Sequence, residues 1–292
     1  MCSSDLHWVS ILMPAYPGVY YPYQWELCYH QLHYSIPTSD LASVATKWGI
    51  LRLFRQPQDT EKLDNIYRRF VEGKHGYSLR SLNHWTNLVD EHSLGGGYVY
   101  LLEKDGQPEG YVFYELRDGN LRVREMAYTS PQAQSGLMQF LYQHRSQAET
   151  VEWNAPLDDC LHFKLPNPKR AVSLEPFMSA RIVDAEKALG AIRYPADIDA
   201  TVALAIEDDL ASWNHRLLSL SVRAGQGRVS PLDARPADAV HCPIGALTQL
   251  LFGRLSAAEL RTMGKIRTTD ADAVKLLDQI FPKCNNYINE YY

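Results

Sequence analysis

The stretch from residue 50 to residue 154 constrains the fold most, because its apolar residues switch between the period of a strand and that of a helix. Residues 50–54 alternate as a strand does. Two helices follow: Asp59-Thr60 caps the first, and Ser78 opens the second. The series is completed by strands at 98–103, 109–116 and 120–128, a helix from Ser130 to about residue 147, and a strand at 150–154. We therefore expect an α+β domain with a mixed sheet and helices.

A further α+β unit is predicted from residue 181 onward. A short helix ends at residue 190, and four strands are expected at 200–206, 216–222, 228–231 and 239–242. Three helices follow, at 245–252, at 257–263 with Ser256 as N-cap, and from Thr269-Asp270 to about residue 281. The last residues, 282–292, are not helical and end in aromatic side chains, so we expect a tail there.

Composition excludes several classes of protein. The chain has 292 residues, which is room for about two domains. A net charge of −5 argues against binding to nucleic acid, because affinity for phosphate depends on clustered Lys and Arg. The longest apolar run, residues 242–251, is too short to span a bilayer. Five cysteines without close pairs indicate a reducing compartment, and with no targeting segment visible we expect a cytoplasmic protein.

Residues 19–26 read Val-Tyr-Tyr-Pro-Tyr-Gln-Trp-Glu. This run resembles the F-Y-x-x-F-G-[FYW]-E pattern that ends many domains of the GNAT superfamily of N-acetyltransferases. Tyr20 stands six residues before the acid. A phenol, with an unperturbed pKa of about 10, can protonate a leaving thiolate and stay neutral at pH 7. The alternative is that Tyr20 is one of eighteen tyrosines, placed on an aromatic loop.

The element order of residues 50–154 is also the GNAT order, but the cofactor position departs from the family pattern. GNAT domains have [QR]-x-x-G-x-[GA] there, and backbone N–H groups at a helix N-terminus hold the pyrophosphate of coenzyme A. Here residues 130–138 read Ser-Pro-Gln-Ala-Gln-Ser-Gly-Leu-Met. Only Gly136 is a glycine, and Met138 occupies the final small position. We expect this domain to have the GNAT shape without the cofactor site.

The whole chain resembles the enhanced-intracellular-survival (Eis) family of acetyltransferases. The resemblance rests on residues 151–159, on 177–184 (FMSARIVD) followed by Ala188-Leu189, and on 206–208, 213–214, 247–253 and 258–260. Members have an N-terminal GNAT domain, a central GNAT-like domain without cofactor, and a C-terminal domain similar to sterol carrier protein. Residues 36–47 contain Pro, Ser and Thr with little periodic pattern, so we expect a linker there. The resemblance implies a GNAT remnant at 7–35, a GNAT-like domain at 48–180 and a sterol-carrier-like domain at 181–292.

The resemblance also implies a reaction and its residues. Such enzymes transfer acetyl from acetyl-CoA to primary amines, namely aminoglycosides, lysine side chains or polyamine-like acceptors, and they form hexamers. The family places its C-terminal carboxylate in the active site of the first domain. Tyr292 would then supply that carboxylate as base, and Tyr20 its phenol as acid. Glu290 is either a further contact for the amine or a solubilising charge.

The start of the chain leads to an expectation about its completeness. Back-translated, residues 2–6 match the end of a common sequencing adapter, so residues 1–6 are interpreted as an artefact. The residues that would form the cofactor loop of the first GNAT domain are absent from the chain. We therefore expect an N-terminally truncated acetyltransferase that is inactive by itself.

Two further segments have alternative interpretations. Cys28, His30 and His33 could be taken for metal ligands, but on a strand the first two face one side and the third the other, so no metal is expected. The helix at 244–252 could line a lipid tunnel, although an ordinary buried helix is the more frequent case. The alternative function is thus a non-catalytic lipid- or partner-binding module built on the sterol-carrier-like domain.

Overall fold

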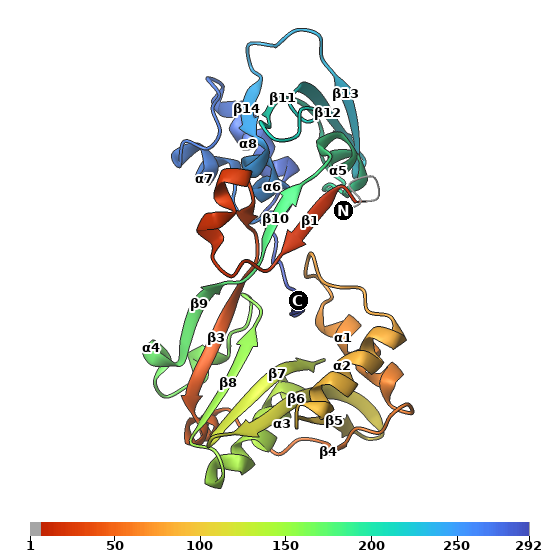
Figure 1. The fold of residues 1–292 in the computed structure, drawn as a ribbon, viewed down its shortest axis with the longest axis vertical. Coiled ribbons are helices and arrows are strands. Elements are labelled where there is room, and N and C mark those ends of the chain that lie inside the picture. The colour runs from red at the N-terminus through yellow and green to blue at the C-terminus, as the bar shows by residue number, and fades with distance from the viewer. Residues whose placement is uncertain (1–6, 292) are drawn as a thin grey trace. The chain divides into compact units, whose positions relative to one another are not determined.

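The computed structural model describes residues 7–291 (Figure 1). These residues form two compact units. The central unit comprises residues 31–175 and Tyr287–Glu290. The terminal unit comprises residues 7–30, 176–286 and Tyr291. The expected artefact at residues 1–6 and the expected base Tyr292 both lie outside the described residues.

The central unit is built on one seven-stranded mixed sheet with the order β4-β5-β6-β7-β8-β3-β9. Neighbouring strands from β4 to β7 are antiparallel, and β7 and β8 are parallel. The strands are β4 (Ile50–Leu53), β5 (Tyr98–Lys104), β6 (Gln107–Arg117), β7 (Asn120–Tyr128), β8 (Thr150–Ala155), β3 (His30–Pro37) and β9 (Val172–Pro176). The α+β expectation with a mixed sheet is confirmed.

Helices cover both faces of this sheet, and the alternation of side chains along the strands explains how. Leu101 packs with helices α1 (Thr60–Phe70) and α2 (Leu82–Leu94), while its neighbour Leu102 packs with α3 (Pro131–Gln143). Successive side chains of a strand point to opposite faces, so each face has its own apolar core. Short helical segments complete the unit: η3 (Thr38–Ser43), η4 (His144–Ser146), η5 (Leu161–Lys164) and α4 (Pro168–Ala171).

Two sequence-based expectations for this unit need correction. The second helix is capped by Ser81 and not by Ser78, because Ser81 Oγ accepts a hydrogen bond from His84 N. Residues 36–47 are not a free linker: Ile36 belongs to β3, and Leu41 of η3 is fully buried. Pro, Ser and Thr are frequent in linkers, but here the apolar residues between them pack into the core.

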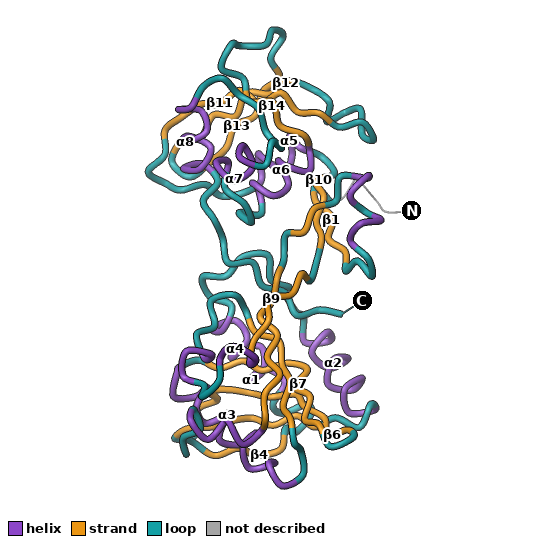
Figure 2. Tube along the Cα trace, turned by 90° about the vertical axis from the view of Figure 1, so that its left-hand side faces the viewer, coloured by secondary structure: helices purple, strands orange, loops and turns teal. Residues whose placement is uncertain are grey.

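The terminal unit contains a four-stranded sheet with the order β13-β12-β11-β14. Its strands are β11 (Asp199–Glu207), β12 (Leu217–Arg223), β13 (Gln226–Pro231) and β14 (Val240–Pro243). Helices α5 (Ala185–Ala191), α6 (Ile244–Leu251), α7 (Ala257–Thr262) and α8 (Ala271–Ile280) gather on one side of these strands (Figure 2). Helix α6 is buried along seven of its eight residues, as expected for a core helix.

A three-stranded antiparallel sheet joins the start of the chain to this unit. It has the order β1-β10-β2, with β1 (Val9–Leu12), β10 (Ser179–Ile182) and β2 (Glu26–Leu27). Every residue of the central strand β10 is buried. This strand falls in the stretch 177–184 that resembles the Eis family, but the sequence pattern gave no sign of a strand there. Two short helical turns, η1 (Pro17–Val19) and η2 (Tyr21–Tyr23), lie between β1 and β2.

Candidate functional site

Tyr20 lies between the two helical turns η1 and η2 of the terminal unit. Its backbone carbonyl accepts hydrogen bonds from Tyr23 N at 3.0 Å and Trp25 N at 3.3 Å. Its ring meets the Trp25 indole edge-on, with the ring centroids 6.5 Å apart. The side chain is half-buried, and its phenol makes no hydrogen bond to any residue in the range 7–291. The tight turns thus fix the position of the ring and leave the hydroxyl available.

The tail that leads to Tyr292 is held in the central unit by residues Tyr287–Glu290, all of which are buried. Tyr287 packs edge-on against Phe70 at 5.5 Å, and its N–H donates to His75 O at 2.9 Å. The Gln31 amide donates to Ile288 O at 3.3 Å. Chain ends usually fray, so this degree of burial shows that the tail has a defined binding position in the central unit.

The tail binds where strands β7 and β8 of the sheet separate. The parallel pairing of β7 and β8 runs from Asn120–Thr150 to Val123–Trp153 and ends there. The next residue of β7, Arg124, directs its carbonyl to the Asn289 amide, which donates to it at 3.1 Å. The tail therefore satisfies a backbone acceptor that the neighbouring strand leaves free.

A buried cluster of side chains around Arg80 binds the carboxylate of Glu290. The guanidinium forms a bidentate pair with Glu125 at 2.7 and 2.8 Å, and its Nε donates to Glu290 Oε1 at 2.8 Å. The second Glu290 oxygen lies 3.2 Å from His84 Nε2. The Arg80 side chain is 0% exposed, and the Tyr67 and Trp85 rings lie against it at 4.4 and 4.5 Å. Such charge-assisted, bidentate contacts are the strong class of hydrogen bond.

The pKa values in the cluster follow from burial and charge. Burial alone would raise the pKa of Glu125, but Arg80 and hydrogen bonds from Tyr111 and Asn289 outweigh it, so the pKa lies below its ordinary value. For Tyr111, burial and the nearby Glu125 carboxylate raise the pKa well above its ordinary value. For Arg80, burial opposes the charged form, but Glu125 raises the pKa. Arg80 and Glu125 therefore form an ion pair, and Tyr111 beside them is neutral.

The N-terminus of α3 does not fit a pyrophosphate. Ser130 Oγ already accepts from Ala133 N at 3.1 Å, as an N-cap does. In the first turn, Gln134 donates to the carboxylate of Asp159 at 2.9 Å. Asp159 is buried and also accepts from Tyr34 OH at 2.6 Å and Tyr128 OH at 3.0 Å. A fixed carboxylate at this place would repel a phosphate group.

Gly136 has a packing role in this helix. A Cβ built on it would lie 2.7 Å from Trp48 O, closer than real Cβ contacts allow. The glycine permits the close approach of α3 to residue 48, and this accounts for it without a phosphate.

Sequence reasoning did not identify the residues that hold the tail or the carboxylate near the N-terminus of α3. Arg80, Glu125, Asn289 and Asp159 were not singled out, and Glu290 was assigned either to the substrate or to solvent. The unusual signal was the tail itself, whose Asn and aromatic residues at 285–292 suit hydrogen bonding inside a protein better than exposure to solvent.

The Cys28, His30 and His33 set does not form a metal centre. His30 Nδ1 accepts from Arg254 Nε at 3.0 Å, and His33 Nδ1 lies 2.9 Å from Asn154 Oδ1. Burial raises the pKa of the Cys28 thiol, so this residue is a neutral core side chain. Within residues 7–291, no group of three or more His, Cys, Asp or Glu side chains is placed to hold a metal ion. No helix in that same range has the length and apolar character needed to cross a membrane.

Two family models match the chain. Residues 76–182 match a model described as an acetyltransferase (GNAT) domain, and residues 185–289 match a sterol carrier protein domain. An uncharacterized N-acetyltransferase of Streptomyces avermitilis is 28% identical over 197 residues, which are 63% of this chain and 45% of that protein. The chain thus spans less than half of the length of this curated relative.

Solved structures share the fold over nearly the whole chain. A probable N-acyltransferase from Enterococcus faecalis has a TM-score of 0.87 at 23% identity, covering 99% of this chain and 74% of that one. A GCN5-related N-acetyltransferase from Anabaena variabilis has 0.82 at 25%, covering 97% and 73%. Eis1 from Mycobacterium abscessus has 0.75 at 20%, covering 99% and 75%. The chain therefore contains a GNAT acetyltransferase domain followed by a domain like sterol carrier protein.

Proposed function

We propose that the chain is part of an Eis-type N-acetyltransferase that moves acetyl from acetyl-CoA to a primary amine of an aminoglycoside, a lysine side chain or a polyamine. In this proposal the central unit does not bind acetyl-CoA. It anchors the tail, and the cofactor is bound by a further GNAT domain. The GNAT and sterol-carrier matches, together with the shared fold, support the reaction class.

The observation on which the proposal rests is the buried position of the tail residues Tyr287–Glu290 in the central unit. Three contacts to Glu290 and Asn289, from Arg80, His84 and the Arg124 carbonyl, fix the chain two to three residues before its end. A terminal carboxylate on a fraying tail would have no defined position. An anchored one can serve a reaction that depends on geometry.

The roles of the two tyrosines follow from their chemistry. The α-carboxylate of Tyr292, with an ordinary pKa of about 3.5, is ionised at pH 7 and accepts the proton of the attacking amine, directly or through water. It also attracts cationic acceptors. The phenol of Tyr20, free of hydrogen-bond partners among the described residues, donates a proton to the leaving thiolate. The amine nitrogen forms the bond to the acetyl carbon, and the sulfur leaves as thiol.

A panel of acceptors tests the proposal. The protein, with its cofactor-binding GNAT domain present, is incubated with acetyl-CoA and an aminoglycoside, a lysine-containing peptide or spermidine, and free thiol is measured. We expect thiol release that depends on the amine and disappears with acceptors that have only hydroxyl groups. Release at the same rate without any amine, or none with all three classes, would contradict the proposal.

A further inference from the structure

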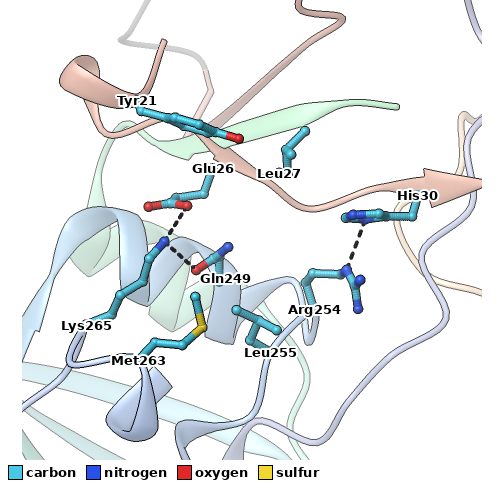
Figure 3. A pocket seen from close by; sticks show the side chains of 9 residues that line it. All are labelled: Tyr21, Glu26, Leu27, His30, Gln249, Arg254, Leu255, Met263 and Lys265. Atoms are coloured by element: carbon cyan, nitrogen blue, oxygen red, sulfur yellow. Dashed lines mark hydrogen bonds and ion pairs between the residues drawn. The ribbon is translucent and has the colours of Figure 1, made fainter. Parts of the chain in front are cut away.

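A pocket of about 540 Å³ in the terminal unit has no role in the proposed reaction (Figure 3). Its volume is in the range of small-molecule sites. One end is formed by Glu26 and Lys265, the other by His30 and Arg254, and apolar side chains lie between them. These apolar side chains are Leu27, Leu255 and Met263.

The charge at the first end is already balanced. Lys265 Nζ lies 2.6 Å from Glu26 Oε2 and donates to Gln249 Oε1 at 3.2 Å (Figure 3). The ammonium therefore has a carboxylate of its own, and this end adds no net charge to the pocket.

The charge at the other end has no counter-charge. The only side-chain hydrogen bond of Arg254 within residues 7–291 joins its Nε to His30 Nδ1 at 3.0 Å, and no carboxylate in this range pairs with it. His30 accepts this bond and is therefore neutral. Burial, assisted by the nearby Arg254 charge, lowers the pKa of His30 to about 4. The terminal N–H groups of Arg254 are left without an acceptor in the described structure.

The backbone fixes Arg254 in this position. Gly253 ends the α6 region with φ 59, and a Cβ there would lie 2.6 Å from Pro282 O, so a side chain cannot replace its hydrogen. The Arg254 N–H then donates to Gln249 O at 2.9 Å. The guanidinium is thus oriented from both its backbone and its Nε, which lowers the entropy lost when it binds an anion.

We propose that this pocket binds a small organic carboxylate with an apolar body. The carboxylate accepts two parallel hydrogen bonds from the Arg254 fork, whose planar geometry matches it. The body packs on Leu27, Leu255 and Met263. The net charge of the pocket, with Arg254 and Lys265 against Glu26, is +1 and favours an anion. This site depends only on the terminal unit and is independent of acetyl transfer.

Calorimetric titration with three probes tests the ligand class. Benzoate has the charge and the apolar body, benzamide has the body without the charge, and inorganic phosphate has the charge without the body. We expect benzoate to bind at least about tenfold more tightly than either of the others. Equal affinity for benzamide would reject the role of Arg254, and equal or tighter binding of phosphate would reject the apolar part.

Three variants test the residues. Arg254→Gln should weaken benzoate binding at least about tenfold, while Arg223→Gln, which removes an exposed arginine of the same unit, should have no effect. Glu26→Gln should strengthen binding at least about threefold, because it leaves Lys265 unpaired beside the ligand. This gain cannot result from damage to the fold, so it decides the matter even if Arg254→Gln misfolds. Weaker binding by Glu26→Gln, or equal losses in the two arginine variants, would overturn the proposal.

Discussion

Arg80 faces two carboxylates, Glu125 and Glu290, with one positive charge, and all three side chains are buried. The arrangement is stable because each carboxylate has further partners. Glu125 accepts from Tyr111 at 2.5 Å and from Asn289 at 2.9 Å, and Glu290 lies beside His84. Buried polar groups that are fully hydrogen-bonded define one conformation, and here that conformation includes the end of the chain.

Tyr20→Phe should lower kcat by about 10²–10⁴-fold and leave the affinity for acetyl-CoA nearly unchanged, because a positioned acid acts on the leaving group and not on cofactor binding. Steady-state kinetics of the protein with its cofactor domain, together with calorimetry, separate the two effects. Trp25 retains its edge-on contact with the phenylalanine ring. A loss below about threefold would mean that Tyr20 only packs.

Individual residues differed in how well sequence could predict them. Ser256 was predicted as an N-cap and Ser130 as the start of its helix, because these signals depend on residues within one helical turn. Arg80 and Glu125 are 45 positions apart, and Glu290 is 210 positions from Arg80. No periodicity links such residues, so their cluster could not be derived without the fold.

At the level of elements, the tail Tyr287–Glu290 belongs to the central unit, although the sterol-carrier match extends to residue 289. Most helices of both units and the hairpin of β5 and β6 were predicted closely, because apolar periodicity is local. Strands β10 and β3 were harder. In β10 every residue is buried, so no alternation is visible, and the end of β3 has the composition of a linker.

Arg80→Met should lower the free energy of unfolding of the central unit by about 3–5 kcal/mol, because it leaves two buried carboxylates without their cation. Urea unfolding followed by tryptophan fluorescence measures the change. Arg68→Met is the matched control: Arg68 pairs with Asp64 from an exposed position on α1, so its loss should have a much smaller effect than the loss of Arg80. Equal effects of the two substitutions would show that the buried cluster does not stabilise the tail.

At the level of the whole molecule, we propose that the central unit does not bind acetyl-CoA, because the protein's own groups surround the N-terminus of α3. Titration of the 292-residue chain with acetyl-CoA should therefore give no heat of binding in the micromolar range. The physical reason is the capped N-terminus of α3 and the carboxylate of Asp159 beside it. An acetyltransferase domain with an intact loop is the positive control. Micromolar binding by the 292-residue chain would refute this account of residues 130–138.

The architecture as a whole was predictable, because element order and family motifs extend over most of the sequence. The compact units divide near residue 30 and again near residue 176, and the two family matches meet between residues 182 and 185, beside expected limits of 35 and 180. Strand β3 (His30–Pro37) runs across the expected limit at residue 35, and composition alone does not reveal such a strand. The hexamer and the cytoplasmic location stay predictions.

The placement of the terminal carboxylate is the central claim, and two changes at the chain end test it most directly. In the protein with its cofactor domain, a few glycines added after Tyr292 keep every residue but move the charge by several ångströms. We expect kcat to fall about a hundredfold, since displacements of this order have such effects where geometry sets the rate. Tyr292→Phe keeps the carboxylate in place and should retain nearly full activity. The opposite ranking, a harmful phenylalanine and a harmless extension, would contradict the claim.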